Sequence, residues 1–478
     1  MAELGMDVPQ PHVVILPFPA QGHIKPMLML AELLCHAGFD ITFVNTDHNH
    51  THIDQSGFHS RFPRLRFMSI PDGLPPEHPR IFSGRLAPDW LFSTRSVSKP
   101  KFKDLVISLS QETGRWSPPT CIIADGIMSS AIDVAEELEI PVITFRTYNA
   151  GSTWINFHIT KLIEKGEIPF QGDDMNRPIT SIPELENILR RKDLPSICRV
   201  EEVENPVLQF YITETAAMTR ASALILNTFN ELEAPVISQL GSIFPKIYTI
   251  GPLHALLESR IKDHPRSDSS NGSLRKQDRT CLTWLDSQPS KSVIYVSFGS
   301  VVVLTHDQLL EFWHGLVNSE KPFLWVRRQG LLGMDEEVGE TPAELMRGTE
   351  ERGCIVGWAP QEEVLAHRAV GGFLTHGGWN STLESILAGV PMVCWPQVAD
   401  QQPNSRFVSD LWGIGLDMKD TCDRSIVEKM VRDLMEGKRE SIRQSSAEIS
   451  RMAHDSVQEG GSSYCNIDKL IEHTRSIM

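Results

Sequence analysis

Short apolar runs alternate with helix-like segments through the first half of the chain. Four of these runs are continuous and rich in β-branched residues, which is typical of strands buried on both faces. They are Val13–Leu16, Ile41–Val44, Cys121–Ala124 and Val142–Phe145. Apolar residues at helical spacing predict helices at Ile24–Ala37, which Gly38 ends, and around Ser130–Leu138. This order predicts a parallel sheet with helices on both faces.

The same rhythm restarts in the second half. Strands are expected at Val293–Ser297, Phe323–Val326, Cys354–Val356, Gly372–Thr375 and Met392–Cys394. Helices are expected at His306–Asn318 and Asn380–Ala388. Between the two halves, residues 262–278 are polar and rich in serine, which predicts a mobile surface loop near a domain boundary. The simplest architecture is two doubly wound α/β domains that face each other across a cleft.

Length and charge narrow the class of protein. A chain of 478 residues is too long for one hydrophobic core, and 41% hydrophobic with 22% charged residues is typical of a folded globular protein. The formal net charge of −16 argues against nucleic acid or an anionic membrane as the partner. It does not exclude a small anionic ligand, because backbone dipoles can bind a phosphate locally.

The cysteines and the N-terminal segment bear on the compartment. None of the eight cysteines forms a C-x-x-C pair, which favours reduced and mostly buried thiols. The segment before the first apolar run contains acidic residues and no Lys or Arg, so we expect no signal peptide. The apolar runs are too short to span a membrane. The sequence therefore predicts a cytoplasmic protein without stable membrane insertion.

A strand, a glycine turn and a helix meet in the second half. The strand Gly372–Thr375 ends at His376-Gly377-Gly378, and the helix begins at about Trp379 or Asn380. Glycines let a ligand approach the backbone closely, and the free N–H groups of a first helical turn attract anions. A tightly packed turn without a ligand would also explain the bare His-Gly-Gly motif. The packing explanation does not account for the further polar residues that lie near strand ends, such as Asp400.

The first half contains a histidine and an aspartate that are candidates for a general base and its partner. His23 follows the first expected strand at the mouth of a helix, and Asp125 directly follows the strand Cys121–Ala124. If these strands are neighbours, the carboxylate orients the ring and stabilises the imidazolium form of a general base. On spacing alone, an ordinary surface or core histidine is the more common explanation of His23.

The block from Trp358 to Gln401 resembles the signature box of the plant family 1 UDP-glycosyltransferases. The segments PFPAQGHIKPM, IGPL and VSFGS extend the resemblance over nearly the whole chain. The resemblance implies the GT-B fold, which consists of two Rossmann-like domains across a cleft. It also implies a hexosyltransferase that uses a UDP-sugar as co-substrate, with no cofactor and no metal.

The resemblance implies a UDP-sugar site. Trp358 matches the residue that stacks on uracil, and Gln361 matches a residue that contacts the ribose or the base. Glu384 matches the carboxylate that binds the ribose hydroxyls. His376, Asn380, Ser381 and Ser300 match diphosphate contacts, with Trp379 beside them near the sugar. Asp400 and Gln401 match the pair that binds the sugar hydroxyls. Glutamine at the last position goes with UDP-glucose in the family, whereas histidine goes with UDP-galactose. The residues concerned are Ser300, Trp358, Gln361, His376, Trp379, Asn380, Ser381, Glu384, Asp400 and Gln401.

The resemblance also implies the chemistry. His23 matches the family's catalytic base and Asp125 its partner, while Thr147 matches a residue that touches the donor sugar. The implied reaction is an inverting displacement, in which an acceptor hydroxyl attacks the anomeric carbon and gives a β-glucoside or a glucose ester. The chain has no D-x-D motif, which agrees with a diphosphate site that needs no divalent metal.

The last two expectations concern the limits of the domains and the kind of acceptor. We expect an acceptor-binding domain at 1–252, joined by a C-terminal helix at 458–478, and a UDP-sugar-binding domain at 253–457, in a monomer. The segment SIPDGLPPEHPR resembles enzymes that glucosylate monoterpenoids, including iridoids, while flavonoids and other phenolics are the alternative acceptors.

Two other functions are disfavoured by the sequence. A dehydrogenase is disfavoured because neither first βα turn carries G-x-G-x-x-G. A non-catalytic UDP-sugar-binding protein is disfavoured by His23 and Asp125.

Overall fold

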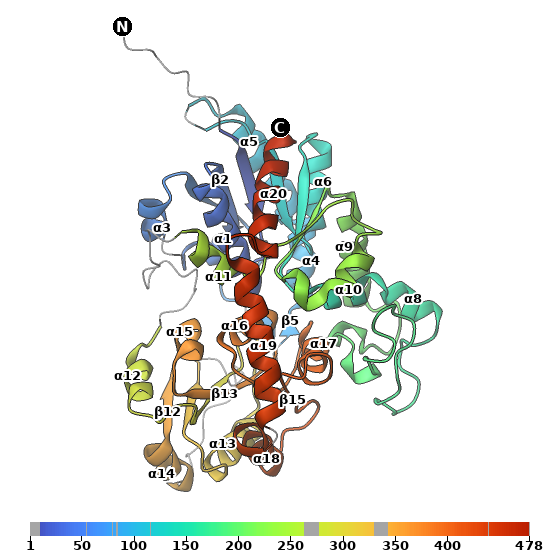
Figure 1. The fold of residues 1–478 in the computed structure, drawn as a ribbon. Coiled ribbons are helices and arrows are strands. Elements are labelled where there is room, and N and C mark those ends of the chain that lie inside the picture. The colour runs from blue at the N-terminus through green and yellow to red at the C-terminus, as the bar shows by residue number, and fades with distance from the viewer. Residues whose placement is uncertain are drawn as a thin grey trace.

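The computed structural model describes residues 10–53, 55–78, 80–82, 85–114, 116–261, 277–328, 343–437 and 439–477. It contains two large parallel sheets, each with helices around it (Figure 1). The expected loop at 262–278 lies outside the described residues, except for its last two. The two doubly wound α/β units predicted from the sequence are confirmed.

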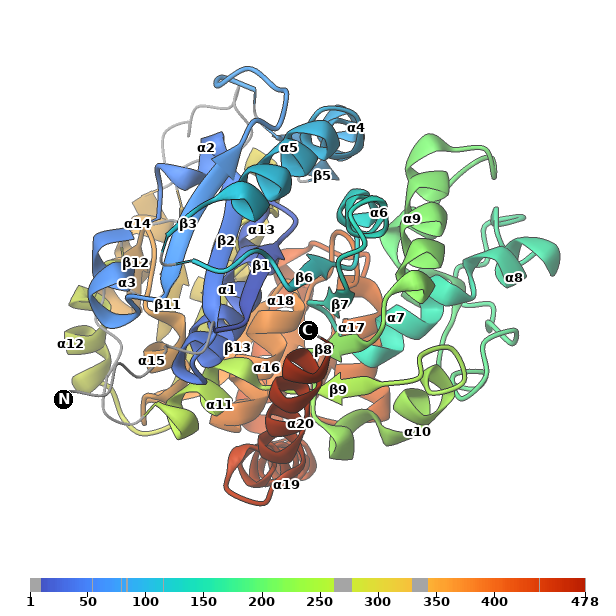
Figure 2. The same ribbon diagram turned by 90° about the horizontal axis from the view of Figure 1, so that it is seen from above.

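The first sheet has seven strands in the order β3-β2-β1-β6-β7-β8-β9, and every neighbouring pair is parallel (Figure 2). The strands are β1 (His12–Leu16), β2 (Asp40–Thr46), β3 (Leu65–Ile70), β6 (Cys121–Asp125), β7 (Val142–Arg146), β8 (Leu224–Leu226) and β9 (Ile247–Thr249). The strand order reverses between β1 and β6, where Leu16 pairs with Ala124. Such a reversal opens a crevice at the carboxyl ends of the two strands.

Helices of the first half cover both faces of this sheet. They are α1 (Gln21–His36), α2 (Asp47–His50), α3 (Gln55–Arg61), α4 (Pro88–Ser96), α5 (Ser98–Gln111), α6 (Ser129–Glu137), α7 (Ala150–Phe157), α8 (Ile159–Glu164), α9 (Pro206–Ala217), α10 (Asn230–Leu240) and α11 (Leu253–Arg260). The helix expected from Ile24 begins three residues earlier, at Gln21. The first turn faces a cleft, so it lacks the apolar side chains on which the prediction rested.

The second sheet has six strands in the order β12-β11-β10-β13-β14-β15, again all parallel. The strands are β10 (Val293–Ser297), β11 (Phe323–Val326), β12 (Gly353–Val356), β13 (Val370–Thr375), β14 (Met392–Cys394) and β15 (Gly415–Asp417). Here the order reverses between β10 and β13, where Ser297 pairs with Thr375. Each sheet therefore offers one crevice where a ligand can bind.

The helices of the second half are α12 (Thr280–Asp286), α13 (His306–Asn318), α14 (Ala343–Arg352), α15 (Gln361–Ala366), α16 (Trp379–Ala388), α17 (Gln401–Arg406), α18 (Arg424–Arg432), α19 (Arg439–Val457) and α20 (Ser462–Ser476). The last two run along both halves of the molecule (Figure 1). Asn466 of α20 donates to Thr249 Oγ1 at 2.9 Å, and Arg475 donates to the Ala37 carbonyl at 2.7 Å. The C-terminal helix therefore packs on the first sheet.

Buried strand residues form the core on both sides of each sheet. All five residues of β1, β6, β7 and β10 are buried, which explains why these strands are continuous apolar runs in the sequence. Among the residues that the structure describes, no helix combines the length and the apolar character needed to cross a membrane.

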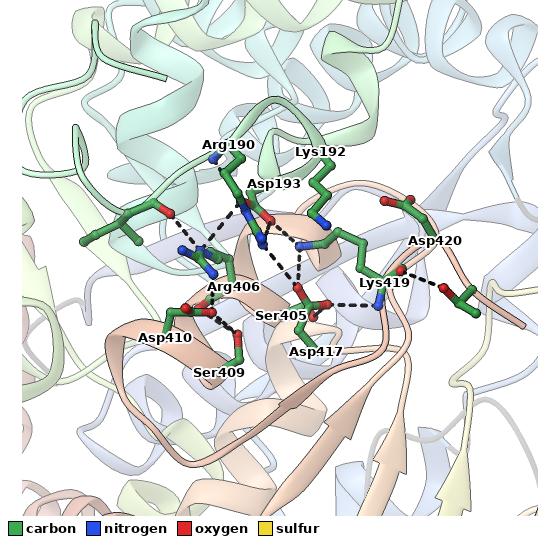
Figure 3. Close-up of polar contacts among 12 residues, drawn as sticks. Arg190, Lys192, Asp193, Ser405, Arg406, Ser409, Asp410, Asp417, Lys419 and Asp420 are labelled. Carbon is green, nitrogen blue, oxygen red and sulfur yellow. Dashed lines mark hydrogen bonds and ion pairs between the residues drawn. The ribbon is translucent and has the colours of Figure 1, made fainter. Parts of the chain in front are cut away.

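A buried ion cluster joins the two halves (Figure 3). Lys419 Nζ lies 2.5 Å from Asp193 Oδ1 and 3.2 Å from Asp417 Oδ2, and the side chains of Asp193 and Lys419 are almost fully buried. Arg190 donates to Asp193 from the same half at 2.7 Å. Burial acts to raise the pKa of Asp193, but the hydrogen bond from Arg190 and the charge of Lys419 outweigh it and hold this pKa below its usual value.

We predict that Lys419→Met lowers the free energy of unfolding by about 3 kcal/mol, the lower end of the cost of breaking a buried ion pair, because Arg190 still pairs with Asp193. The exposed pair Arg199–Asp420, at 3.2 Å, is the matched control. Arg199→Met should cost less than about 1 kcal/mol. Urea unfolding curves of the two variants make the comparison, and equal midpoints would contradict the prediction.

Candidate active site

One large cleft lies between the two halves, with a volume of about 1010 Å³. Its wall includes residues that follow β1, β7, β10 and β13, close to the point in each sheet where the strand order reverses. The predicted site residues that line it are His23, Thr147, Ser300, Trp358, Gln361, His376, Trp379, Asn380, Ser381, Glu384, Asp400 and Gln401. Asp125 lies behind His23 and is buried.

The histidine and the aspartate of the first half form a close pair. His23 Nδ1 lies 2.7 Å from Asp125 Oδ2, because α1 follows β1 and Asp125 ends the neighbouring strand β6. Two further bonds fix the carboxylate, from the Phe18 N–H at 3.3 Å and the Ile127 N–H at 3.1 Å. Thr147 Oγ1 lies 3.1 Å from the same ring nitrogen. These contacts occupy Nδ1 and leave Nε2 of His23 as the ring nitrogen able to accept a proton.

His376 stands at the carboxyl end of β13, packed between two glycines. A Cβ on Gly299 would lie 2.6 Å from its ring, and one on Gly378 would lie 2.4 Å from Nε2, so neither position has room for a side chain. Gly299 also has φ +69°, which favours glycine. Burial and the nearby Arg328 lower the pKa of His376 to about 4, although a backbone hydrogen bond with Ser297 opposes them. The ring is therefore neutral at pH 7.

The first turn of α16 connects the cleft to the first half. Asn380 Nδ2 donates to the Gly22 carbonyl at 2.9 Å. The Trp379 indole is buried, and its N–H donates to the Asn227 carbonyl at 2.6 Å. The indole N–H is thus part of the contact between the halves, and the backbone N–H groups of this turn remain the natural anion donors.

Gln361, Ser381 and Glu384 form a hydrogen-bonded group on the second half. Gln361 Nε2 donates to Ser381 Oγ at 2.9 Å and to Glu384 Oε2 at 2.6 Å. Its oxygen accepts from the Tyr295 hydroxyl at 3.2 Å. Trp358 lies just before α15 at the same wall of the cleft. The structure thus brings a tryptophan ring, an amide and a carboxylate together, although they are separated in sequence.

Asp400 and Gln401 lie at the start of α17. Burial raises the pKa of Asp400, while hydrogen bonding from Asn404 and the nearby His23 act in the opposite direction. Gln401 Oε1 accepts from the backbone N–H groups of Gln397 at 2.9 Å and Val398 at 3.0 Å. These two bonds engage the amide oxygen of Gln401. Its NH₂ group is therefore the part that can donate to a ligand.

The sequence reasoning missed Lys25, which bridges the cleft. Its ammonium lies 2.6 Å from Glu362 Oε1 and 2.7 Å from Glu384 Oε1. Burial acts to lower the pKa of Lys25, but the two carboxylates outweigh it and raise that pKa. The only available signal was its position in the same segment as His23, because its partners are far away in sequence.

Comparisons with known proteins identify the family of the chain. The family described as "UDP-glucoronosyl and UDP-glucosyl transferase" matches residues 116–459. The chain is 51% identical over 477 residues to 7-deoxyloganetic acid glucosyltransferase of Catharanthus roseus, covering 98% of each chain. It is 49% identical over 457 residues to mogroside I-A1 synthase of Siraitia grosvenorii, covering 94% of this chain and 86% of the relative.

Solved structures give the same result. Os79 from O. sativa in complex with UDP superposes with a TM-score of 0.80 at 29% identity, covering 97% of this chain and all of the other. A Medicago truncatula protein complexed with UDP-glucose has a TM-score of 0.80 at 27% identity, covering 97% of this chain and 98% of the other. The fold is GT-B, and the chain belongs to the UDP-glycosyltransferase family.

Proposed function

We propose that the protein transfers glucose from UDP-glucose to a small lipophilic plant metabolite, with inversion at the anomeric carbon. The observation that carries this proposal is the pairing of two crevices across one cleft. One crevice holds the His23–Asp125 pair at 2.7 Å. The other holds His376 and the first turn of α16.

In the proposed reaction, His23 Nε2 takes the proton of the acceptor hydroxyl while its oxygen forms a bond to the anomeric carbon. The bond from that carbon to the diphosphate oxygen breaks, and UDP leaves with the electron pair. Asp125 stabilises the imidazolium that forms. His376, Asn380, Ser381 and Ser300 bind the diphosphate, Trp358, Gln361 and Glu384 bind the uridine, and Asp400, Gln401, Trp379 and Thr147 lie around the sugar.

We propose a monoterpenoid or iridoid as the acceptor. The base rests on the apolar core of the first half, with the buried Phe18 5.3 Å from the His23 ring and the buried Trp90 5.1 Å from Phe18. Relatives support the same class, since one is named for an iridoid acid at 51% identity. Phenolics are the alternative, because a relative at 44% identity is a myricetin 3-O-rhamnoside 1,2-glucosyltransferase.

An acceptor panel tests this function directly. The purified protein is incubated with UDP-glucose and iridoid, monoterpenoid, flavonoid or simple phenolic acceptors, and products are identified by mass spectrometry. A glucoside with β configuration by NMR supports the proposal, with the best kcat/KM expected for an iridoid. Binding of UDP-glucose without product from any acceptor would instead favour a non-catalytic sugar-nucleotide-binding protein.

Donor choice gives a second test. Glucose and galactose differ in the direction of one hydroxyl, so a wrong donor leaves one polar group unpaired. Such a loss costs about 1–3 kcal/mol, or roughly 5- to 150-fold in kcat/KM. We expect UDP-glucose to be preferred over UDP-galactose within this range, and Gln401→His to narrow the gap. Equal rates with both donors in the unaltered protein would contradict the role given to Gln401.

We also propose that transfer needs no metal. Support comes from the neutral donors at the diphosphate position, which are the His376 ring, the Ser381 hydroxyl and the N–H groups that begin α16. We therefore expect activity to survive an excess of EDTA. A loss of activity that Mg²⁺ or Mn²⁺ restores would show that a metal shares in binding the diphosphate.

We infer that residues 1–252 with the helix at 458–478 form the acceptor domain, and that residues 253–457 form the UDP-sugar domain. The helix α11 at the start of the second range packs on α1 of the first half. The return of α20 onto β9 supports this division. We further propose that the protein acts as a cytoplasmic monomer. Its eight cysteines are unpaired, as expected in a reducing compartment, and the proposed site is complete within one chain.

A further inference from the structure

Two buried asparagines connect the first half of the molecule to Asp400. Asn149 caps the N-terminus of α7, where its Oδ1 accepts from the Ser152 N–H at 2.6 Å. Its Nδ2 donates to Asn404 Oδ1, also at 2.6 Å. Both asparagines are fully buried. A hydrogen bond in this position links the acceptor side of the cleft to the sugar side.

The amide of Asn404 has only one orientation that satisfies its partners. Its Nδ2 donates to Asp400 Oδ2 at 2.9 Å and to the Gly377 carbonyl at 2.9 Å. Both partners can only accept, whereas the Asn149 amide group donates. Reversing the amide would place oxygen against oxygen on one side and N–H against N–H on the other. Asn149 at 2.6 Å, with a longer bond from Ser152 Oγ at 3.5 Å, therefore supports from the first half the orientation in which the Asn404 NH₂ faces Asp400.

The backbone before Asp400 is also held from the first half. Ala399 has a backbone angle φ of 58°, which residues other than glycine rarely adopt. Ser196 stabilises this residue through two bonds, because its Oγ accepts from the Ala399 N–H at 2.9 Å and its N–H donates to the Ala399 carbonyl at 3.2 Å. Asp400 thus starts from a backbone position that the other half fixes.

The far end of α17 is anchored in the same way. Arg406 Nε donates to the Ile188 carbonyl at 2.7 Å and lies 3.7 Å from Asp193 Oδ2, which places Arg406 beside the ion cluster defined above (Figure 3). The short helix that carries the sugar pair is therefore fixed at both ends by residues of the first half. Small shifts of this helix would move the Asp400 carboxylate.

We propose that Asn404 is a positioning residue for the Asp400 carboxylate, and that Asn149 holds the Asn404 amide in place for this role from across the domain interface. This inference rests on the proposed function, in which Asp400 binds the hydroxyls of the transferred sugar. Asn404 acts through Asp400 and does not itself contact the substrate. The effect should therefore appear for the sugar part of the donor and not for its nucleotide.

The variant Asn149→Asp separates this role from simple packing. It keeps the size and the helix cap, since a carboxylate oxygen can still accept from the Ser152 N–H. A carboxylate at position 149 cannot donate, so Asn404 Oδ1 would face a negatively charged oxygen in place of an N–H group, and only the longer bond from Ser152 Oγ at 3.5 Å would be left to it. This repulsion should displace the Asn404 amide, and with it the bond to Asp400. The matched control is Asn205→Asp, which makes the same change at the cap of α9, where Asn205 Oδ1 accepts from the Val207 N–H at 3.0 Å.

Two measurements are made on each full-length variant: the affinities for UDP and for UDP-glucose by calorimetry, and kcat/KM for UDP-glucose. For Asn149→Asp we expect kcat/KM to fall roughly 10- to 150-fold, as for a lost bond to a charged group, with UDP affinity within about 2-fold of the unaltered protein. Asn205→Asp should change neither. Equal losses for UDP and UDP-glucose, or no loss, would overturn the proposal.

A milder variant covers the case in which a buried carboxylate prevents folding. Asn149→Ser keeps a capping oxygen and is too short to reach Asn404, so kcat/KM should fall roughly 2- to 12-fold with UDP affinity unchanged. An unchanged kcat/KM in this folded variant would also overturn the inference. If the unaltered protein bound UDP but transferred no glucose, the proposed function would fail instead.

Discussion

His23→Ala is expected to lower kcat for transfer to an alcohol acceptor by roughly 10²–10⁴-fold, the range of general-base catalysis. The reason is that Nε2 of His23 is the proton acceptor, while Nδ1 is held by Asp125 at 2.7 Å. Affinity for UDP-glucose should be nearly unchanged, because binding of the nucleotide relies on the other half. Single-turnover rates at saturating donor, with calorimetry of UDP-glucose binding, measure both quantities.

The control for this change is His36→Ala, which alters an exposed histidine in the last turn of the same helix. It should leave kcat unchanged. An acceptor that reacts through a carboxylate is already ionised, so His23→Ala should affect it much less. If His23→Ala kept more than about a tenth of the normal kcat on an alcohol, His23 would not be the general base.

His376→Ala is expected to lower kcat by roughly 10²–10³-fold, as when one preorganised donor to a developing negative charge is removed. The ring sits between Gly299 and Gly378, so its position is fixed before the donor binds. Negative charge grows on the diphosphate as the bond to the sugar breaks, which is when a fixed donor is most effective. Steady-state kinetics at saturating acceptor give this value.

The control is His376→Gln, which removes the ring but keeps an N–H donor of similar reach. We expect it to recover part of the lost kcat. Similar losses in His376→Ala and His376→Gln would mean that the ring acts by filling the space between the glycines. A change in KM for UDP-glucose alone would assign His376 to ground-state binding and would contradict a role in the departure of UDP.

The sequence determined the fold class and the place of nine strands of the two large sheets, although β3, β8, β9 and β15 were not predicted. Val293–Ser297, Phe323–Val326 and Met392–Cys394 are strands with the predicted limits, because a strand buried on both faces needs an uninterrupted apolar run. It also predicted the partnership of His23 and Asp125, which required only that β1 and β6 be neighbours. The roles of these two residues and of the UDP-sugar site remain predictions until the variants are measured.

Only the tertiary structure showed how the two halves meet. Lys25 and Glu384 are 359 positions apart, and Asn149 and Asn404 are 255 apart. Hydrophobic periodicity records which face of an element is buried, and it carries no information about which distant polar group lies opposite. The first turn of α1 was missed for a related reason, because its residues face the cleft and leave no apolar pattern. Cross-domain polar contacts become visible only when both sheets are placed, since a hydrogen bond depends on atomic positions that no local pattern encodes.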